Sequence, residues 1–145
     1  MTWTTFIILC IGLLAAIGAV QSVTLRVTRH VWGRPAVSAD AFAAAHFPEG
    51  QRATAIKLRE LLAPYLPMNI GRLWPTDRLM EDLGLSARLS RGLDLVAFAE
   101  DIEAEFKIEF EETDYYEMTT FRDVVNLVER KTAAQSPAPP SPTAT

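Results

Sequence analysis

Few residues in this 145-residue chain have the types and spacing that chemistry requires. The two histidines, His30 and His46, are 16 positions apart, and neither has a histidine or glutamate partner at metal-binding spacing. Cys10 is the single cysteine, which excludes an intrachain disulfide and a cysteine-based zinc site. The sequence also lacks a nucleophile elbow, a phosphate-binding loop and a dinucleotide-binding glycine motif. We therefore expect no catalytic residues and predict that the protein is not an enzyme.

Carboxylates are the abundant reactive groups, and they are unevenly distributed. Residues 76–131 hold 15 Asp and Glu against 7 Lys and Arg, a net charge of −8, whereas residues 1–75 hold 3 against 7, a net charge of +4. The negative segment would repel phosphate backbones, so we predict no nucleic-acid partner. One cluster of four acidic residues lacks the spacing and the glycine of a calcium-binding loop, so we predict no metal site at this cluster. Its members are Glu109, Glu111, Glu112 and Asp114.

The elements that position these groups begin with a membrane segment. Residues 1–25 carry no charged side chain, and an unbroken apolar run of 15 residues extends from Phe6 to Val20. Residues 3–25 reach the roughly 20 helical residues needed to cross a bilayer core, and Trp3 suits the interface. We predict an uncleaved transmembrane helix within residues 1–25. The alternative is a cleaved secretory signal, which this chain fits poorly because no basic side chain precedes the apolar run.

Charges flank this segment on its C-terminal side alone. The flanking basic residues are Arg26, Arg29 and Arg34. The positive-inside rule then predicts a single-pass protein of the plasma or inner membrane whose C-terminal part is cytoplasmic. Two pairs of small residues four positions apart would suit a homodimer formed through the transmembrane helix. These pairs are Gly12 with Ala16 and Ala15 with Ala19.

Beyond the membrane segment, the sequence predicts an all-α fold. Residues 26–50 are expected to form a juxtamembrane linker with one short helix capped by Ser38. Residues 51–131 carry apolar side chains at three- and four-residue intervals, which predicts a small antiparallel bundle of four helices. The expected helices cover 51–66, 89–106, 113–118 and a last segment that starts with a capping box at Thr120. Residues 132–145 contain four prolines and no charge, so we predict a disordered tail.

The predicted helix over 89–106 has two distinct faces. Its apolar face, with Phe98, Ile102 and Phe106, is expected to be largely buried, together with Val124 of the last helix. Its acidic face carries Asp94, Asp101 and Glu105, which we predict to be exposed and to bind partners with basic patches.

Several segments, in order and at nearly the right spacing, resemble the acyl carrier protein family. The matching stretches are Gln51–Leu66 (first helix), Asp77–Gly84 (the approach to the second helix), Asp94–Phe110 (the second helix and its acidic exit) and Met118–Val125 (start of the last helix). The resemblance covers about 80 of the 145 residues. It implies a carrier-protein fold whose acidic second helix meets basic patches on enzymes of acyl or lipid metabolism.

The chain departs from this family at the attachment site of the prosthetic group. The family links phosphopantetheine to a serine in an Asp-Ser-Leu motif at a helix N-terminus, where free N–H groups and the helix dipole favour phosphate. Here Arg91, Gly92 and Leu93 occupy the motif, so the hydroxyl is absent. The remaining phosphopantetheine candidates are Ser90 and Ser86, each of which would also serve as a helix N-cap.

Together these observations predict a membrane-anchored, acyl-carrier-protein-like docking module without phosphopantetheine. Two alternatives stay open. The chain is a true acyl carrier if Ser90 or Ser86 is modified, and it is a structural subunit of a membrane complex if the bundle only packs against neighbours.

Overall fold

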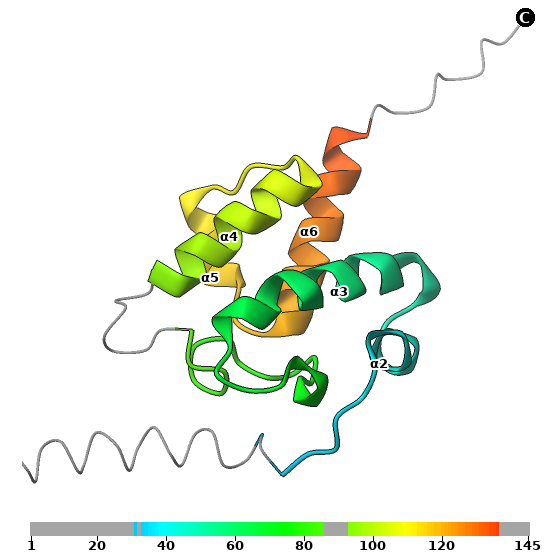
Figure 1. Ribbon diagram of the computed structural model, residues 1–145. Coiled ribbons are helices and arrows are strands. Elements are labelled where there is room, and N and C mark those ends of the chain that lie inside the picture. The colour runs from blue at the N-terminus through cyan, green and yellow to red at the C-terminus, as the bar shows by residue number, and fades with distance from the viewer. Residues whose placement is uncertain (1–30, 32, 86–92, 137–145) are drawn as a thin grey trace, which may run out of the picture. The chain divides into compact units, whose positions relative to one another are not determined.

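The computed structural model describes residues 31, 33–85 and 93–136. The chain divides into two units, Met1–Arg34 and Pro35–Thr145. The unit Pro35–Thr145 is an all-helical domain, and the described residues contain no named strand (Figure 1). Its elements are α2 (Ala39–His46), α3 (Glu49–Leu62), η1 (Ala63–Tyr65), η2 (Ile70–Arg72), α4 (Leu93–Phe106), α5 (Glu112–Glu117) and α6 (Phe121–Gln135). The predicted transmembrane segment lies outside the described residues. Within them, no helix combines the length and apolar character needed to span a bilayer.

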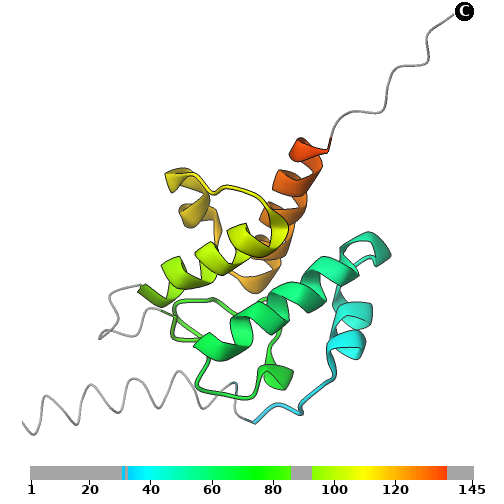
Figure 2. The same cartoon turned by 45° about the horizontal axis from the view of Figure 1, so that its top comes forward.

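Helix α2 belongs to the domain, although the sequence placed it in a linker. The Ser38 hydroxyl accepts a hydrogen bond from the Ala41 amide at 3.2 Å, which confirms the predicted cap. Helix α2 packs beside α3, as both views of the ribbon show (Figures 1 and 2). Its Phe42 and the following Phe47 are buried in the main core, so the bundle begins before residue 51.

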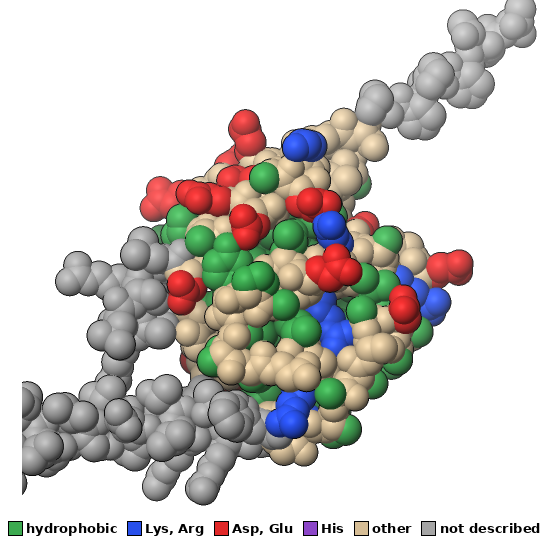
Figure 3. Space-filling model, viewed as in Figure 1, with side chains coloured by type: hydrophobic (Ala, Val, Ile, Leu, Met, Phe, Trp, Pro, Cys, Tyr) green, Lys and Arg blue, Asp and Glu red, His purple; other side chains and the backbone are tan. Residues whose placement is uncertain are grey.

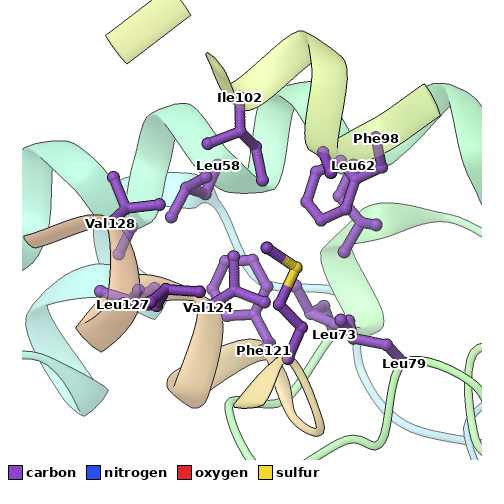
Figure 4. Packing of buried hydrophobic residues seen from close by; sticks show 14 of the residues in the cluster. Leu58, Leu62, Leu73, Leu79, Phe98, Ile102, Phe121, Val124, Leu127 and Val128 are labelled. Carbon is purple, nitrogen blue, oxygen red and sulfur yellow. The ribbon is translucent and has the colours of Figure 1, made fainter. Parts of the chain in front are cut away.

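The core lies where α3, α4 and α6 meet (Figure 4). Each helix contributes buried apolar side chains at helical spacing: Leu58 and Leu62 from α3, Phe98 and Ile102 from α4, and Phe121, Val124, Leu127 and Val128 from α6. The predicted burial of Phe98, Ile102 and Val124 is confirmed. Phe106 is only partly buried, because it is the last residue of α4 and packs at the edge of the cluster.

The first and the last helix of the predicted bundle differ from their expected bounds. The first predicted helix extends from Glu49 to Leu62 rather than from 51 to 66, because Pro64 turns the chain into the 3₁₀ segment η1. The last helix begins with the predicted capping box, in which the Thr120 hydroxyl accepts from the Asp123 amide and Asp123 accepts from the Thr120 amide. It ends at Gln135, four residues into the range expected to be a disordered tail.

The segment between η2 and the gap at residue 86 has no long helix, yet it fills the core. Its Leu73, Leu79 and Leu85 are fully buried. Backbone hydrogen bonds from Leu79 to Thr119 and from Arg122 to Pro75 hold this segment against the start of α6. The turn that brings Leu85 back to Leu79 passes through Gly84, whose φ of 73° favours glycine.

Arg59 fixes the start of the domain to α3. It is 3% exposed, and its Nη2 donates to the carbonyls of Val37 at 2.6 Å and Ile70 at 3.2 Å. The guanidinium carbon lies 4.8 Å from the centroid of the Phe42 ring. Removal from water lowers the pKa of Arg59. A buried guanidinium with carbonyl and aromatic partners therefore connects α2, α3 and η2.

Candidate functional site

The predicted acidic face of α4 lies along the contact between α4 and α3. The Tyr65 hydroxyl donates to Oδ2 of Asp101 at 2.5 Å, and Nζ of Lys57 lies 3.1 Å from Oε1 of Glu105. Asp94 is partly buried and also has an interaction partner. The three carboxylates are therefore brought together on one side of α4, where Asp101 and Glu105 are exposed as expected and Asp94 is partly buried, and each of them has an interaction partner.

Helical phase explains this placement. Leu95, Phe98 and Ile102 direct one side of α4 into the core, and Asp101 and Glu105 follow on the flank that faces α3. The side opposite the core carries Val96, Glu100 and other exposed residues. Glu105 remains 44% exposed at its side chain, so its ion pair is open to solvent and contributes little to stability.

The bond between Tyr65 and Asp101 changes the acid–base behaviour of the phenol. Hydrogen bonding to Asp101, partial burial, and the negative charges of Asp101, Asp94 and Glu100 together raise the pKa of Tyr65 to about 12. The phenol therefore stays protonated at physiological pH and acts as a donor that holds α4 near the end of α3.

A second set of carboxylates points away from the core. Glu100, Glu109 and Glu112 are exposed and form no ion pair with any described residue, and Tyr116, one turn after Glu112, is 78% exposed. We call these four residues the α4–α5 acidic surface. Acidic side chains gather over α4 and α5 in the space-filling view (Figure 3). Burial and the nearby carboxylates of Glu103 and Glu100 raise the pKa of Tyr115, which lies beside this surface in α5.

The acidic group at 109–114 is partly used for structure. Asp114 and Glu111 form a capping box at the start of α5. Asp114 is 5% exposed, and its Oδ2 lies 2.5 Å from Nζ of Lys131 in α6. Burial alone would raise the pKa of Asp114, but the hydrogen bonds from Lys131 and the Glu111 amide outweigh it and lower that pKa. No cluster of metal-ligating side chains occurs in the described part of the chain.

The two phosphopantetheine candidates, Ser86 and Ser90, lie outside the described residues, as does Gly92. The described part of α4 starts at Leu93, the residue directly after the glycine that replaces the family's serine.

The cavities found among the described residues are surface features. One of about 410 Å³ is lined by Glu117, Thr119, Asp123, Asn126, Leu127 and Arg130, and its Arg130 and Glu117 are paired at 2.6 Å. Asp123 is occupied by the α6 cap. Three of the six lining residues, Glu117, Asp123 and Arg130, are therefore engaged in contacts within the domain.

The sequence did not predict the burial of Arg59 or the hydrogen bond between Tyr65 and Asp101. A lysine or arginine on a helix is usually solvated, so nothing in the local pattern distinguishes Arg59 from its exposed neighbours. A search against models of known protein families matched none to this chain.

Proposed function

We propose that the chain is a membrane-anchored docking module built on a carrier-protein-like helical bundle, and that it works without phosphopantetheine. Its partners are enzymes of acyl or lipid metabolism that carry basic patches. In this proposal residues 3–25 span the plasma or inner membrane, the bundle lies in the cytoplasm, and the anchor helices can pair as a homodimer.

The observation that carries the proposal is the α4–α5 acidic surface. Its three glutamates are not neutralised by described neighbours, and clustered like charges disfavour the compact state. Such charges are well suited to attract a basic partner and to accelerate encounter. The exposed ring of Tyr116 adds the kind of aromatic group that anchors protein interfaces.

Reversal of the charges on this surface tests the docking role. The variant Glu100→Lys/Glu109→Lys/Glu112→Lys should lose chemical cross-links to its partner in native membranes while the melting temperature stays close to wild type. The matched control Asp40→Lys/Glu49→Lys/Glu60→Lys changes net charge equally on α2 and α3 and should keep the cross-links. Equal cross-linking by both variants would favour a structural subunit instead.

Asp94, Asp101 and Glu105 require a different design, because Asp101 is also bonded to Tyr65 of η1 and Glu105 to Lys57 of α3. Glu105→Lys breaks the pair with Lys57 and reverses the charge at once. The double exchange Lys57→Glu/Glu105→Lys restores a pair and keeps position 105 positive. If Glu105 contacts the partner directly, both variants lose binding; if it acts only within the domain, the double exchange recovers binding.

Intact mass tests the absence of a prosthetic group. Treatment of the purified full chain with a carrier-protein phosphopantetheinyl transferase and coenzyme A should leave its mass unchanged, because Gly92 offers no hydroxyl. Mass added at Ser86 or Ser90 would replace this proposal with a true acyl carrier. The topology has its own test: protease added to sealed, right-side-out cells should leave the bundle intact.

A further inference from the structure

A tryptophan is exposed on the segment that packs against the start of α6. Trp74 is 45% exposed, whereas Leu73 beside it is fully buried. Its backbone is fixed, because the Trp74 amide donates to Oδ2 of Asp77 at 2.8 Å. Its ring centroid lies 5.9 Å from that of His46 at the end of α2. The exposed indole therefore has a defined position beside α2.

Two exposed arginines adjoin the same part of the domain. The Arg122 amide donates to the Pro75 carbonyl at 2.8 Å, and its guanidinium carbon lies 5.7 Å from the Phe47 ring centroid. Nε of Arg52 donates to the Phe47 carbonyl at 3.2 Å. Neither guanidinium forms an ion pair with a described carboxylate. We call Trp74, Arg52 and Arg122 the tryptophan–arginine surface.

The chemistry of this surface matches that of a lipid headgroup layer. Indole rings concentrate at membrane interfaces because one part of the ring is apolar and the N–H is polar. Arginines near an anionic leaflet are attracted to it over about a Debye length. The acidic surface on α4 and α5 belongs to other elements, and the same leaflet would repel it.

The connection to the predicted anchor would keep the domain within a short distance of the membrane. The predicted span ends at Leu25, and the domain is held from Val37 onward by the Val37 amide on the Gly71 carbonyl and by Arg59. Twelve residues reach at most about 40 Å when fully extended. Such a tether gives a high effective concentration, so a weak contact is sufficient to orient the domain.

We infer that the tryptophan–arginine surface lies on the anionic headgroups of the membrane in which the chain is anchored. This inference rests on the proposed anchoring. In the orientation that follows, Trp74, Arg52 and Arg122 contact lipid, and the α4–α5 acidic surface stays available to a protein partner.

Fluorescence of Trp74 in the full chain tests this contact. Trp3→Phe and Trp32→Phe leave Trp74 as the only tryptophan. The chain is reconstituted into phosphatidylcholine vesicles with or without phosphatidylglycerol, using lipids brominated near the headgroup as quenchers. We expect Trp74 to be quenched and blue-shifted in the vesicles that contain phosphatidylglycerol, and much less in those of phosphatidylcholine alone.

Arginine variants then identify the attracting groups. Loss of each positive charge should lower the ratio of docked to undocked domain about fivefold, so Arg52→Glu/Arg122→Glu should abolish most of the quenching. The control Lys107→Glu/Arg130→Glu makes the same change in net charge at two exposed positions, one directly after α4 and one in α6, and should keep the quenching. An equal loss in the control would overturn the inference, because net charge alone would then explain the effect.

The remaining outcomes separate this inference from the proposed anchoring. If alkaline carbonate extracts the chain from the vesicles, the anchoring fails and the inference fails with it. If the chain stays in the membrane but lipid does not quench Trp74, only the inference is overturned. Protection of Trp74 from aqueous acrylamide without lipid quenching would assign the surface to a protein contact, such as a second copy, and would also overturn it.

Discussion

The contact of α2 with α6 and the contact of α5 with α6 are stabilised by different forces. Phe42 and Phe47 meet Phe121 with ring centroids 5.7 and 6.2 Å apart, and the charge beside them, Arg59, is held by carbonyl oxygens. The α5 contact instead buries a carboxylate, Asp114, against Lys131. The first contact depends on excluding water from aromatic rings, so it should be insensitive to pH. The second depends on the charge state of one group.

The largest effect should come from the aromatic contact. Phe121→Ala removes a fully buried ring that touches both Phe42 and Phe47, so we expect a loss of about 3–5 kcal/mol in the free energy of unfolding. Urea titration of residues 35–145 measures it. The loss should be the same at pH 7 and pH 3, and a strong dependence on pH would show that the two contacts are not independent.

Substitution of Arg59 should give the next largest loss in the free energy of unfolding. Arg59→Met keeps most of the buried stem but removes the arginine donor from the Val37 carbonyl and leaves the Ile70 carbonyl only the Leu73 amide, which should cost about 1–3 kcal/mol. Arg59→Lys should recover little, because a single ammonium lacks the planar set of donors. Faster amide exchange of Val37, which donates to Gly71, should accompany both variants. Wild-type stability in Arg59→Met would assign this part of the domain to apolar packing alone.

Asp114 tests the charged contact through its dependence on pH. The pKa of this carboxyl is lowered in the folded domain, so its contribution is present above the unfolded value of about 4 and is lost as pH falls through the folded pKa. Asp114→Asn should cost about 1–3 kcal/mol at pH 7 and progressively less below pH 3.8. Subtracting the pH profile of the variant from that of wild type isolates this group from the other carboxylates. A pH-independent difference would contradict the assignment.

Features that form within a single helix could be predicted from the sequence. The caps at Ser38 and Thr120 and the burial of Phe98, Ile102 and Val124 follow from local spacing, and the structure confirms them. These features require only the geometry of one helix.

Features that depend on neighbouring elements were not predictable in this way. Asp101 and Glu105 were correctly placed on one side of their helix, but periodicity does not say that this side meets Tyr65 and Lys57. Trp74 lies in a loop without periodicity, so its exposure beside α2 also depends on tertiary packing. The site residues are the least predictable because their partners are distant in the sequence.

Substitution of Tyr65 should give the smallest loss in the free energy of unfolding. Its contact with α4 includes an aromatic ring, like the contact of α2 with α6, and a carboxylate, like the contact of α5 with α6. Its ring packs 5.9 Å from that of Phe98, and its hydroxyl donates to Asp101. Tyr65→Phe keeps the ring and removes the hydrogen bond, which should cost about 0.5–1.5 kcal/mol at neutral pH. Because the pKa of Tyr65 is raised to about 12, this contribution is fully present below pH 10 and is lost as pH rises from about 10 to 12. Absorbance at the phenolate band should show a titration step near pH 12 in wild type, beside that of Tyr115, whose pKa is also raised, and the step near pH 12 should be missing in Tyr65→Phe. If Asp101→Asn brings the step near pH 12 back towards pH 10 while the domain stays folded, the Asp101 carboxylate is its cause. An unchanged step would contradict that assignment and would leave burial and the charges of Asp94 and Glu100 as the causes of the raised pKa.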